Sequence, residues 1–341
     1  MIQNKILTII IPTYNMEKYL RKCMDSLIVS EENMQRLEVL VVNDGSKDSS
    51  SQIAHEYETK YPQTFRVIDK ENGNYGSCIN RGLKETSGEY VKVLDADDYF
   101  ANDIFDKFVT FLLETEADLV INDFCVVAED GDILEKEIYN LPKKLTIGNL
   151  KDSTIKRLFH HGITYKTEVV RSIGYTQTEG ISYTDDEWVY KPMTAVNTII
   201  SFPYFLYYYL RGREGQTFDP EVLRKTHSQK VAVAKSLIDF FCTKYDATRH
   251  ESQNYMLKKI ICRIQPIYDF YLIKNNDSEG NLFLQDFDSF LRERSMLLYE
   301  SMNEVKNRLG WHYILDWRRS GYNRNIFSLL ILRLKYRLQN F

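Results

Sequence analysis

The sequence predicts an α/β fold with a mostly parallel sheet, followed by a helical C-terminal region. In residues 1–125, short β-branched apolar runs alternate with segments of helical periodicity. Acidic residues directly follow several of the apolar runs, and beyond residue 217 the chain contains little Gly or Pro. Strands that alternate with helices in short repeats are typical of a parallel sheet covered on both faces.

Five short runs rich in apolar residues are the expected strands, and we expect the first two to be buried on both faces. They are Ile6–Ile11, Glu38–Val42, Phe65–Asp69, Tyr90–Leu94 and Asp118–Phe124. The expected helices are one containing Tyr19, Leu20, Cys23, Met24 and Leu27, and then Ser49–Tyr61, Ser77–Glu85 and Asp103–Leu113. Ligands bind beyond the carboxyl ends of the strands in such sheets, so we expect Asp44, Asp69 and Asp95–Asp98 at that edge.

Residues 126–217 have a looser pattern of loops and short elements. They include the acidic cluster Asp185-Asp186-Glu187 and the aromatic–basic stretch Tyr207–Arg213. We expect at least two of the tyrosines Tyr207–Tyr209 to pack in the core. Long helices are expected at 220–244 and 251–273, which places a domain boundary near residue 217 and gives domains of 1–217 and 218–341.

Composition excludes several classes of protein. A chain of 341 residues with 43% hydrophobic and 27% charged residues is globular and long enough for two domains. Its five cysteines are scattered without a C-x-x-C pair, which argues against a disulfide framework and a cysteine zinc site. The one close histidine pair is His160-His161, and neighbouring residues on a regular element point apart, so we do not expect a zinc enzyme.

The net charge of −4 is unevenly distributed. Residues 301–341 carry eight basic and two acidic residues, a net +6 that leaves −10 on the first 300 residues. Because the main body is acidic, we expect no nucleic-acid partner. No apolar run reaches the 18 residues of a membrane span, and the run at Ile6–Ile11 is too short for a signal peptide, so we expect a cytoplasmic protein.

Asp95, Asp97 and Asp98 place three carboxylates at the end of one expected strand. Carboxylates so close raise one another's pKa unless a cation neutralises them. Divalent cations such as Mg²⁺ and Mn²⁺ prefer oxygen ligands and often bridge to substrate phosphates. The alternative is a solvated acidic turn that caps the next helix.

Two further segments at this edge have both a functional and an ordinary interpretation. Asp44 precedes Gly45, which is a common turn sequence, but Asp44 could also accept a hydrogen bond from a base or ribose. The glycine-rich segment 72–76 could let the backbone approach a phosphate, although it has neither the dinucleotide fingerprint nor a P-loop motif.

The cluster Asp185-Asp186-Glu187 follows Thr184. In one interpretation it begins a helix, with Thr184 as the cap and the acids in the favourable first turn. In the other, one carboxylate is a general base that removes a proton from a substrate.

Taken together, these segments resemble the family 2 glycosyltransferases, which have the GT-A fold. The resemblance rests on Ile9–Asn15, Val41–Asp48, Asn80–Leu83, Gly88–Asp98 and the pair Asp185-Asp186, which follow the family's order and spacing. It covers roughly residues 5–217 and implies a Rossmann-like sheet flanked by helices.

The resemblance also implies roles for individual residues. The nucleotide-sugar would contact Pro12, Thr13, Tyr14, Asn15, Asp44, Asn72, Gly76, Asp95, Ala96, Arg211 and Arg213, with Asp44 on the uracil or ribose and the two arginines on the diphosphate. Asp97, with Asp95, would hold Mn²⁺ or Mg²⁺. Asp186 matches the catalytic base, and Asp185 stands where the family more often has Glu.

The implied reaction is the transfer of one sugar, with inversion, from a nucleotide-sugar to a glycan or lipid-linked glycan acceptor, as in cell-surface polysaccharide synthesis. UDP is the nucleotide by family habit. The Gln-x-x-Arg-Trp motif of processive synthases is absent from the sequence. Two alternatives remain: a nucleotide-sugar-binding protein of the same fold without activity, and a phosphatase of the haloacid-dehalogenase type, whose D-x-D motif lies nearer the N-terminus.

The last residues form an imperfect amphipathic helix. Its apolar face comprises Phe327, Leu330, Ile331, Leu334, Leu338 and Phe341, flanked by Lys335 and Arg337, while Leu329 and Leu332 fall on the opposite side. A basic apolar helix suits peripheral contact with an anionic membrane at the inner face of the cell membrane. Packing against the protein itself or a partner chain is the other interpretation.

Overall fold

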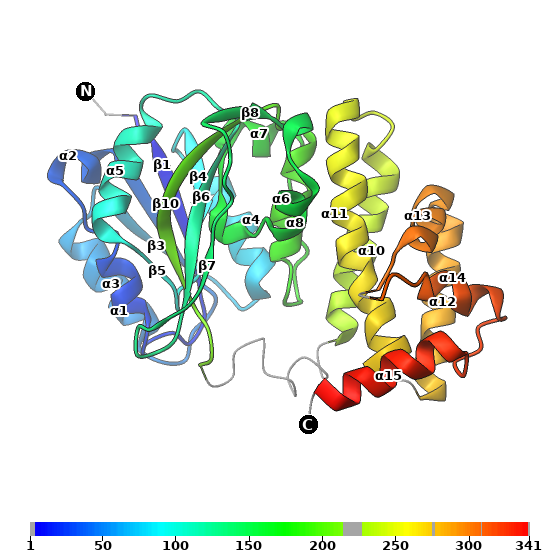
Figure 1. The fold of residues 1–341 in the computed structure, drawn as a ribbon. Helices are drawn as coiled ribbons and strands as arrows, with labels where there is room; N and C mark the ends of the chain where they lie inside the picture. The colour runs from blue at the N-terminus through cyan, green and yellow to red at the C-terminus, as the bar shows by residue number, and fades with distance from the viewer. Residues whose placement is uncertain (1–3, 214–226, 275–276, 308, 340–341) are drawn as a thin grey trace. The chain divides into compact units, whose positions relative to one another are not determined.

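The computed structural model describes residues 4–213, 227–274, 277–307 and 309–339. The chain divides into two compact units, Met1–Val233 and Ala234–Phe341, and the division falls within helix α10 (His227–Lys244) (Figure 1). The boundary expected near residue 217 lies outside the described residues.

The first unit is built on a 10-stranded sheet with the order β3-β2-β1-β4-β9-β6-β10-β5, to which β7 adds beside β6 and β8 beside β10. The strands are β1 (Leu7–Thr13), β2 (Leu37–Asn43), β3 (Phe65–Asp69), β4 (Tyr90–Val93), β5 (Tyr99–Phe100), β6 (Leu119–Val127), β7 (Ile133–Glu137), β8 (Lys144–Thr146), β9 (Ile163–Lys166) and β10 (Thr198–Leu210).

The sheet is parallel in its first half and mixed in its second. β1 pairs in parallel with β2 and β4, and β2 pairs in parallel with β3, as the sequence predicts. β9 then runs antiparallel to both β4 and β6, while β6 and β10 are parallel. The tight turn at Ala128–Asp132, in which Gly131 has φ +93°, returns the chain as β7 antiparallel to β6.

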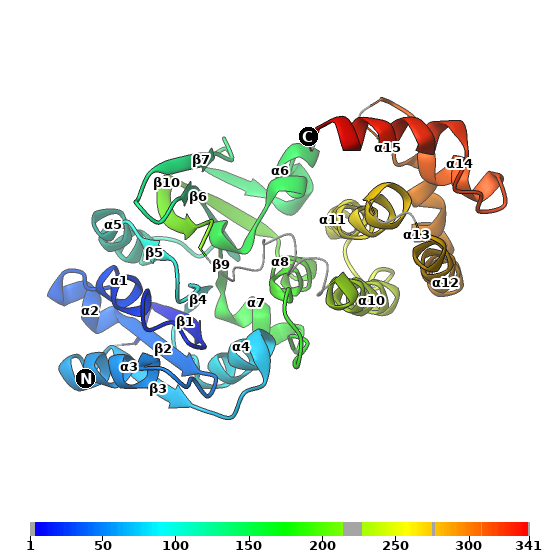
Figure 2. The same ribbon diagram turned by 90° about the horizontal axis from the view of Figure 1, so that it is seen from below.

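Helices cover both faces of this sheet. Figure 2 shows α1, α3 and α5 on one side and α4, α7 and α8 on the other. The helices of the unit before α10 are α1 (Leu20–Asp25), α2 (Glu31–Arg36), α3 (Ser50–Lys60), α4 (Asn74–Glu85), α5 (Asn102–Leu112), α6 (Asp152–Arg157), α7 (Thr167–Ser172) and α8 (Asp185–Tyr190). Because both faces are covered, the central strands are rich in buried apolar residues, and Ile9, Ile10 and Ile11 are completely buried.

The second unit is helical. It contains the rest of α10, α11 (His250–Asp269), the π-helical turn Phe270–Lys274, α12 (Ser278–Arg294), α13 (Met296–Ser301), α14 (Tyr313–Arg319) and α15 (Phe327–Gln339). Its core holds Trp317 and a buried ion pair, Arg318 to Asp288 at 2.5 Å, which Tyr268 joins by a hydrogen bond. None of the described helices is long and apolar enough to cross a membrane.

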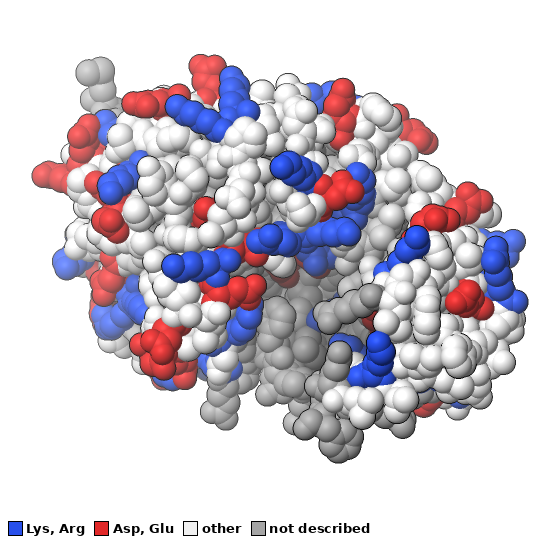
Figure 3. All heavy atoms as spheres, in the orientation of Figure 1, with Lys and Arg blue, Asp and Glu red and all other residues white. Residues whose placement is uncertain are grey.

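Charged side chains of both signs are interspersed on the face seen in Figure 3. Many of them are paired at the surface, as Arg211 is with Glu135 of β7. Exposed pairs of this kind contribute about 0–1 kcal/mol to stability each. The fold therefore depends on the buried sheet and its covering helices rather than on these pairs.

Candidate active site

The carboxyl ends of β1, β2 and β3 form one side of the candidate site. The backbone N–H of Asp44 donates to the carbonyl of Thr13 (2.8 Å), and Asn43 Nδ2 donates to Asp69 Oδ1 (2.6 Å). A pocket of about 580 Å³ opens beside them. It is lined by Tyr14, Asn43, Gly45, Lys47, Asp69, Lys70, Glu71 and Asn72. This volume is in the usual range for small-molecule sites.

Asp44 is buried beside this pocket and is held by basic and backbone donors. Its Oδ1 accepts from Lys70 Nζ (2.5 Å) and from the N–H of Gly73 (3.0 Å), and its carbonyl accepts from Asn72 Nδ2 (3.0 Å). Asn72, which the resemblance assigns to the nucleotide-sugar, thus contacts Asp44. Lys70, which supplies the charge that balances Asp44, is a site residue that the sequence analysis missed.

The turn after β1 is fastened to the turn after β2. Thr13 is buried beyond Pro12, and Asn15 takes a left-handed conformation (φ 53°). The N–H of Asn15 donates to Ser46 Oγ (3.0 Å), and its Oδ1 accepts from the N–H of Lys47 (2.7 Å). These bonds leave the ring of Tyr14, which is 44% exposed, at the pocket.

Three aspartates follow β4, and each has a different partner. Asp98 is completely buried and accepts from the hydroxyl of Tyr207 (2.5 Å) and the N–H of Leu210 (2.7 Å). Burial, and then the charges of Asp97 and Asp95, raise the pKa of Asp98 well above its usual value. Asp98 therefore fastens this turn to β10 rather than facing a ligand.

Asp97 and Asp95, the two aspartates expected to hold a cation, both face positive or donor groups. Asp97 Oδ2 accepts from Arg213 Nε (2.5 Å); burial raises the pKa of Asp97, and Arg213 only partly offsets this. Asp95 accepts from the hydroxyl of Tyr75 (2.9 Å) and lies 3.2 Å from His160 Nε2. Burial favours a higher pKa for Asp95, but His160 and Tyr75 outweigh it, and the pKa is lowered.

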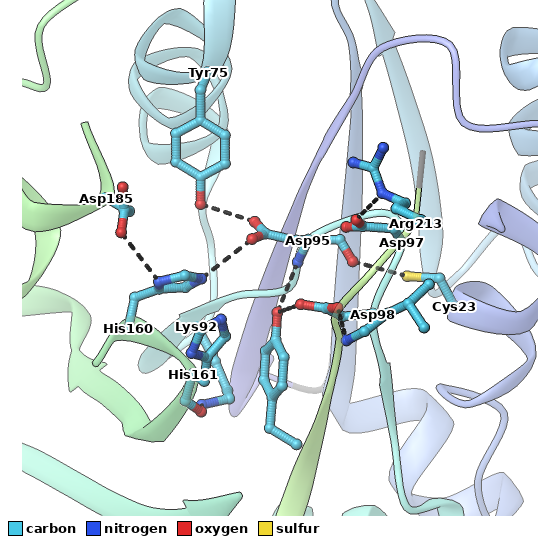
Figure 4. A network of polar contacts seen from close by, with 12 residues as sticks. Cys23, Tyr75, Lys92, Asp95, Asp97, Asp98, His160, His161, Asp185 and Arg213 are labelled. Carbon is cyan, nitrogen blue, oxygen red and sulfur yellow. Dashed lines mark hydrogen bonds and ion pairs between the residues drawn. The ribbon is translucent and has the colours of Figure 1, made fainter. Parts of the chain in front are cut away.

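His160 links this turn to the acidic cluster on α8 (Figure 4). Its Nε2 faces Asp95 Oδ2 at 3.2 Å, and its Nδ1 lies 3.7 Å from Asp185 Oδ2. Burial lowers the pKa of His160, but the two carboxylates outweigh it and the net shift is upward. One buried imidazole thus joins acids from two elements 90 residues apart in the chain.

The expectation that His160 and His161 point apart is wrong. The two residues lie in a 3₁₀ turn, His160–Gly162, and their ring centroids are 3.9 Å apart. The expectation assumed a regular helix or strand, and this turn is neither. Ligand atoms of Asp95, His160 and His161 lie within 4.8 Å of one another, so these three residues form a group that could hold a metal ion.

α8 presents Asp185 and Asp186 in its first turn, both partly exposed. Thr184 makes no side-chain cap to this helix, as its Oγ1 accepts instead from Gln177 Nε2 (2.9 Å), so the capping expected of Thr184 is not found. Glu187 is completely buried and accepts from the N–H and hydroxyl of Thr178 (2.6 and 2.8 Å). Glu187 anchors the preceding loop, while Asp185 lies beside His160.

The aromatic–basic stretch ends β10 and leads to the acidic cluster. The three tyrosines are packed: Tyr208 stacks on Tyr99 (5.2 Å) and Tyr209 on His161 (4.5 Å), while Tyr207 is buried. Arg213 reaches Asp97, as described above. Arg211 instead lies against Glu135, 3.3 Å away, so the structure brings only one of the two arginines to the cluster.

Gly76 and Ala96, both expected at the nucleotide-sugar, are buried. Gly76 lies in α4, where a Cβ atom would be 2.0 Å from the carbonyl oxygen of Thr178. The close approach at Gly76 is therefore to the loop before α8.

Lys92 is a further residue that the sequence analysis missed. It is completely buried in β4 and donates to Asn122 Oδ1 (3.1 Å) and to the carbonyls of His161 (2.8 Å) and Ile163 (3.1 Å). Burial lowers its pKa well below the usual value. A lysine within an apolar run was a visible signal, but its partners lie on elements that only the fold brings together.

Comparison with known proteins agrees with this geometry. Residues 8–174 match the family model described as glycosyl transferase family 2. This part of the chain belongs to glycosyl transferase family 2. The match includes the pocket, the three aspartates after β4 and His160, and it ends before α8.

Similar proteins include bacterial glycosyltransferases. An uncharacterised glycosyltransferase, MG025 of Mycoplasma genitalium, is 40% identical over 128 residues, which are 37% of this chain and 42% of MG025. The minor teichoic acid biosynthesis protein GgaB of Bacillus subtilis is 30% identical over 158 residues, 46% of this chain and 17% of GgaB. The chain thus spans less than half the length of these relatives.

A solved structure covers nearly the whole chain. The crystal structure of residues 1–349 of S. aureus TarS in complex with UDP-GlcNAc matches with a TM-score of 0.72, at 20% identity, over 98% of this chain and 92% of that one. At this identity the match establishes the fold, which is the GT-A fold followed by a helical region. The predicted fold class is confirmed.

Proposed function

We propose that this protein is an inverting glycosyltransferase that transfers one sugar from a UDP-sugar to a glycan or lipid-linked glycan acceptor. The observation that carries the proposal is the acidic cluster after β4, at the same carboxyl edge of the sheet as the pocket and joined to α8 through His160. Membership in family 2 and the UDP-GlcNAc named with TarS support the choice of a nucleotide-sugar donor.

In this proposal, the nucleotide lies in the pocket between the turns after β1 and β2. Tyr14 offers an aromatic face for the base, and Asp44 and Asn72 offer polar groups beside it. The diphosphate lies toward Asp95, Asp97 and Arg213. Arg213 would turn from Asp97 to the phosphates, where a guanidinium binds two oxygens at once.

The residues after β4 fit a divalent cation. Carboxylate oxygens are the ligands that Mg²⁺ and Mn²⁺ prefer, and Asp97 already carries a positive partner in Arg213. Asp97 and Asp95 would hold the ion. Once bound, it supplies positive charge beside the diphosphate as that group leaves.

The chemistry is then a single displacement. Asp186 removes the proton from an acceptor hydroxyl, which attacks the anomeric carbon from the face opposite the nucleotide. The configuration inverts, so an α-linked donor gives a β-linked product. Arg213 stabilises the charge of the departing diphosphate, and the pocket supplies orientation.

The relatives and the last helix suggest the acceptor. GgaB is named for teichoic acid biosynthesis, which supports a cell-surface glycan or its lipid-linked precursor. In α15, Phe327, Leu330, Leu334 and Leu338 are exposed at helical spacing, beside the exposed Lys335. We place the protein in the cytoplasm, with α15 in peripheral contact with the anionic inner face of the membrane.

Calorimetric titration with UDP, GDP and inorganic phosphate, each with and without Mn²⁺, tests the proposal. We expect tight binding of UDP that depends on Mn²⁺ and weakens at least 10-fold in Asp97→Ala. The control Asp103→Ala removes an exposed carboxylate of α5 and should bind like the wild type.

Absence of nucleotide binding would contradict the donor site. Binding of UDP-sugars without transfer or hydrolysis of any of them would instead identify an inactive binding protein of the same fold. Release of phosphate from phosphate esters without nucleotide binding would identify a phosphatase.

A further inference from the structure

We propose that His160 is a positioning residue that ties the turn after β4 to the first turn of α8, and so sets the distance between the donor and Asp186. The inference rests on the proposed function for its catalytic consequence. The tether itself follows from the contacts of one buried side chain.

The imidazole of His160 has an acidic partner at each nitrogen. Its Nε2 lies 3.2 Å from Asp95 Oδ2, and its Nδ1 lies 3.7 Å from Asp185 Oδ2. Asp95 belongs to the proposed donor site, and Asp185 immediately precedes Asp186. The His160 side chain is 7% exposed, and its partners Asp95 and Asp185 are 25% and 41% exposed, so water competes less for the contact with Asp95 than for the contact with Asp185.

The turn His160–Gly162, which carries this ring, is itself held in place by its neighbours. Lys92 donates to the carbonyls of His161 and Ile163, which fixes this turn against β4. A Cβ atom on Gly162 would lie 2.9 Å from the ring of Tyr139 and 3.0 Å from the carbonyl of Asn122, so the turn fits closely between β6 and Tyr139. The imidazole that lies between Asp95 and Asp185 is therefore carried by a rigid turn.

The beginning of α8 contacts both the loop before it and His160. The helix has six residues, and Thr184 provides no side-chain cap. In its first turn Glu187 accepts from Thr178, and Thr184 accepts from Gln177, which hold the turn to its own preceding loop. Asp185 adds the contact to His160 and so to the turn after β4. Without an imidazole between them, the carboxylates of Asp95 and Asp185 would repel each other, and the first turn would move away from the donor.

Hydrogen–deuterium exchange of the whole protein tests the tether independently of any activity. In His160→Ala, the amides of residues 184–190 should exchange at least about 10-fold faster, while those of α3 keep their wild-type rates. His160→Gln, whose amide can still donate, should give an intermediate rate. His250→Ala, a change at an exposed histidine, should match the wild type. Unchanged exchange of α8 in His160→Ala overturns the proposal.

Kinetics test the catalytic consequence. A misplacement of about 1 Å can cost about 100-fold in rate. We expect His160→Ala to lower kcat for sugar transfer by 10- to 100-fold, with the KM for the donor changed less than about 3-fold because Tyr75 still holds Asp95. If His160 acts through Asp185, Asp185→Asn should lower kcat similarly, and the double variant should be little worse than either single one.

The outcomes distinguish failure of the positioning role of His160 from failure of the proposed function. Faster exchange of α8 with unchanged kcat in an active enzyme removes the positioning role. Additive losses in the double variant show that His160 does not act through Asp185, which also overturns it. A wild-type protein that neither binds nor turns over any nucleotide-sugar refutes the proposed function, and with it the catalytic consequence, although the exchange result still decides whether the tether exists.

Discussion

His160 and His161 are neighbours with opposite electrostatic surroundings. His160 faces two carboxylates, whereas both ring nitrogens of His161 are buried and have no hydrogen-bond partner among the described residues. Burial, and then the positive groups His160 and Lys92, lower the pKa of His161 well below its usual value. The ring stacks on Tyr209 at 4.5 Å, so it behaves as an aromatic core residue.

We expect His161→Phe to reduce the acid sensitivity of the fold. The unfolded chain takes up a proton on His161 near pH 6.5 and the folded protein does not, so His161 lowers stability as the pH falls through that value. Between pH 7 and 5 this costs about 2 kcal/mol of unfolding free energy. Urea titrations at both pH values should show a smaller loss in the variant, and an equal loss would contradict it.

At pH 7 the same variant should be at least as stable as the wild type. Replacing a buried polar group that has no partner by an apolar group of the same shape is neutral or stabilising. The phenyl ring keeps the stacking on Tyr209 and the tilted contact with Phe124. A loss of more than about 1 kcal/mol would mean that the ring nitrogens of His161 are not free of partners in solution.

Asp186→Asn should separate catalysis from donor binding. Loss of a general base lowers transfer by about 10²- to 10⁴-fold, while the dissociation constant of the UDP-sugar should stay within about 3-fold of the wild type. Single-turnover transfer and calorimetry measure the two quantities. Asp152→Asn, which removes an acid from the first turn of α6, is the matched control and should transfer normally. Unimpaired transfer by Asp186→Asn would remove it as the base.

At the scale of elements, the sequence predicts the first half of the sheet well because continuous apolar runs mark buried parallel strands. β3 was predicted with the observed bounds, and β1, β2 and β4 to within two residues at either end. β10 was not predicted, because its burial does not alternate regularly, its pairing with β6 shifts register between Phe202 and Tyr207, and its partners β5, β6 and β8 are distant in sequence. Local pattern does not encode such pairing.

The sequence likewise predicts some residues of the candidate site and not others. Its acids could be predicted, since each follows a strand whose end must lie at one edge. Their partners Lys70, Tyr75 and His160 could not, because these contacts join residues up to 65 positions apart. The spacing of apolar residues in a helix or strand gives no information about such contacts. The turn that contains His160 has neither the helical nor the strand spacing.

Gly76→Ala tests the contact between α4 and the loop before α8. The added Cβ would lie 2.0 Å from the backbone oxygen of Thr178, so the loop must move. We expect a loss of about 1–3 kcal/mol in stability, from urea titration, and a fall in kcat because Thr178 is bonded to Glu187 of α8.

Gly174→Ala is the control for this change. Its Cβ would meet no atom within 4 Å, and it has φ +60°, so it should cost about 1–2 kcal/mol of stability through backbone strain alone and leave kcat unchanged. Equal effects of the two variants on kcat would exclude a specific role for the contact at Gly76.

At the scale of the whole molecule, the last helix has two different faces. Leu329 and Arg333 are buried, and Arg333 donates to the carbonyls of Leu272 and Arg324 (both 2.8 Å), which attaches α15 to its own unit. The predicted apolar face remains exposed at Phe327 and Leu334, while Phe341 lies outside the described residues. Deleting the helix would therefore disturb the fold as well as the exposed face.

Surface substitutions test membrane contact more cleanly than a deletion. We expect the triple variant Leu330→Ser, Leu334→Ser, Leu338→Ser to bind vesicles of phosphatidylglycerol and phosphatidylcholine at least about 10-fold more weakly, since each buried CH₂ contributes about 0.8 kcal/mol. Flotation measures binding. The control triple Leu113→Ser, Ile133→Ser, Leu134→Ser changes exposed apolar residues of the first unit and should bind normally. Equal binding of all three proteins would exclude α15 as the contact.

The ion pair of Arg213 with Asp97 bears on the order in which ligands enter the proposed site. A bare cation arriving alone would meet a carboxylate that is already neutralised at 2.5 Å. A nucleotide that arrives with its cation also brings phosphates, which give the displaced guanidinium a new partner. We therefore expect an ordered scheme in which the metal–nucleotide complex is the species that binds to the protein. An excess of free metal ion should accelerate this binding little.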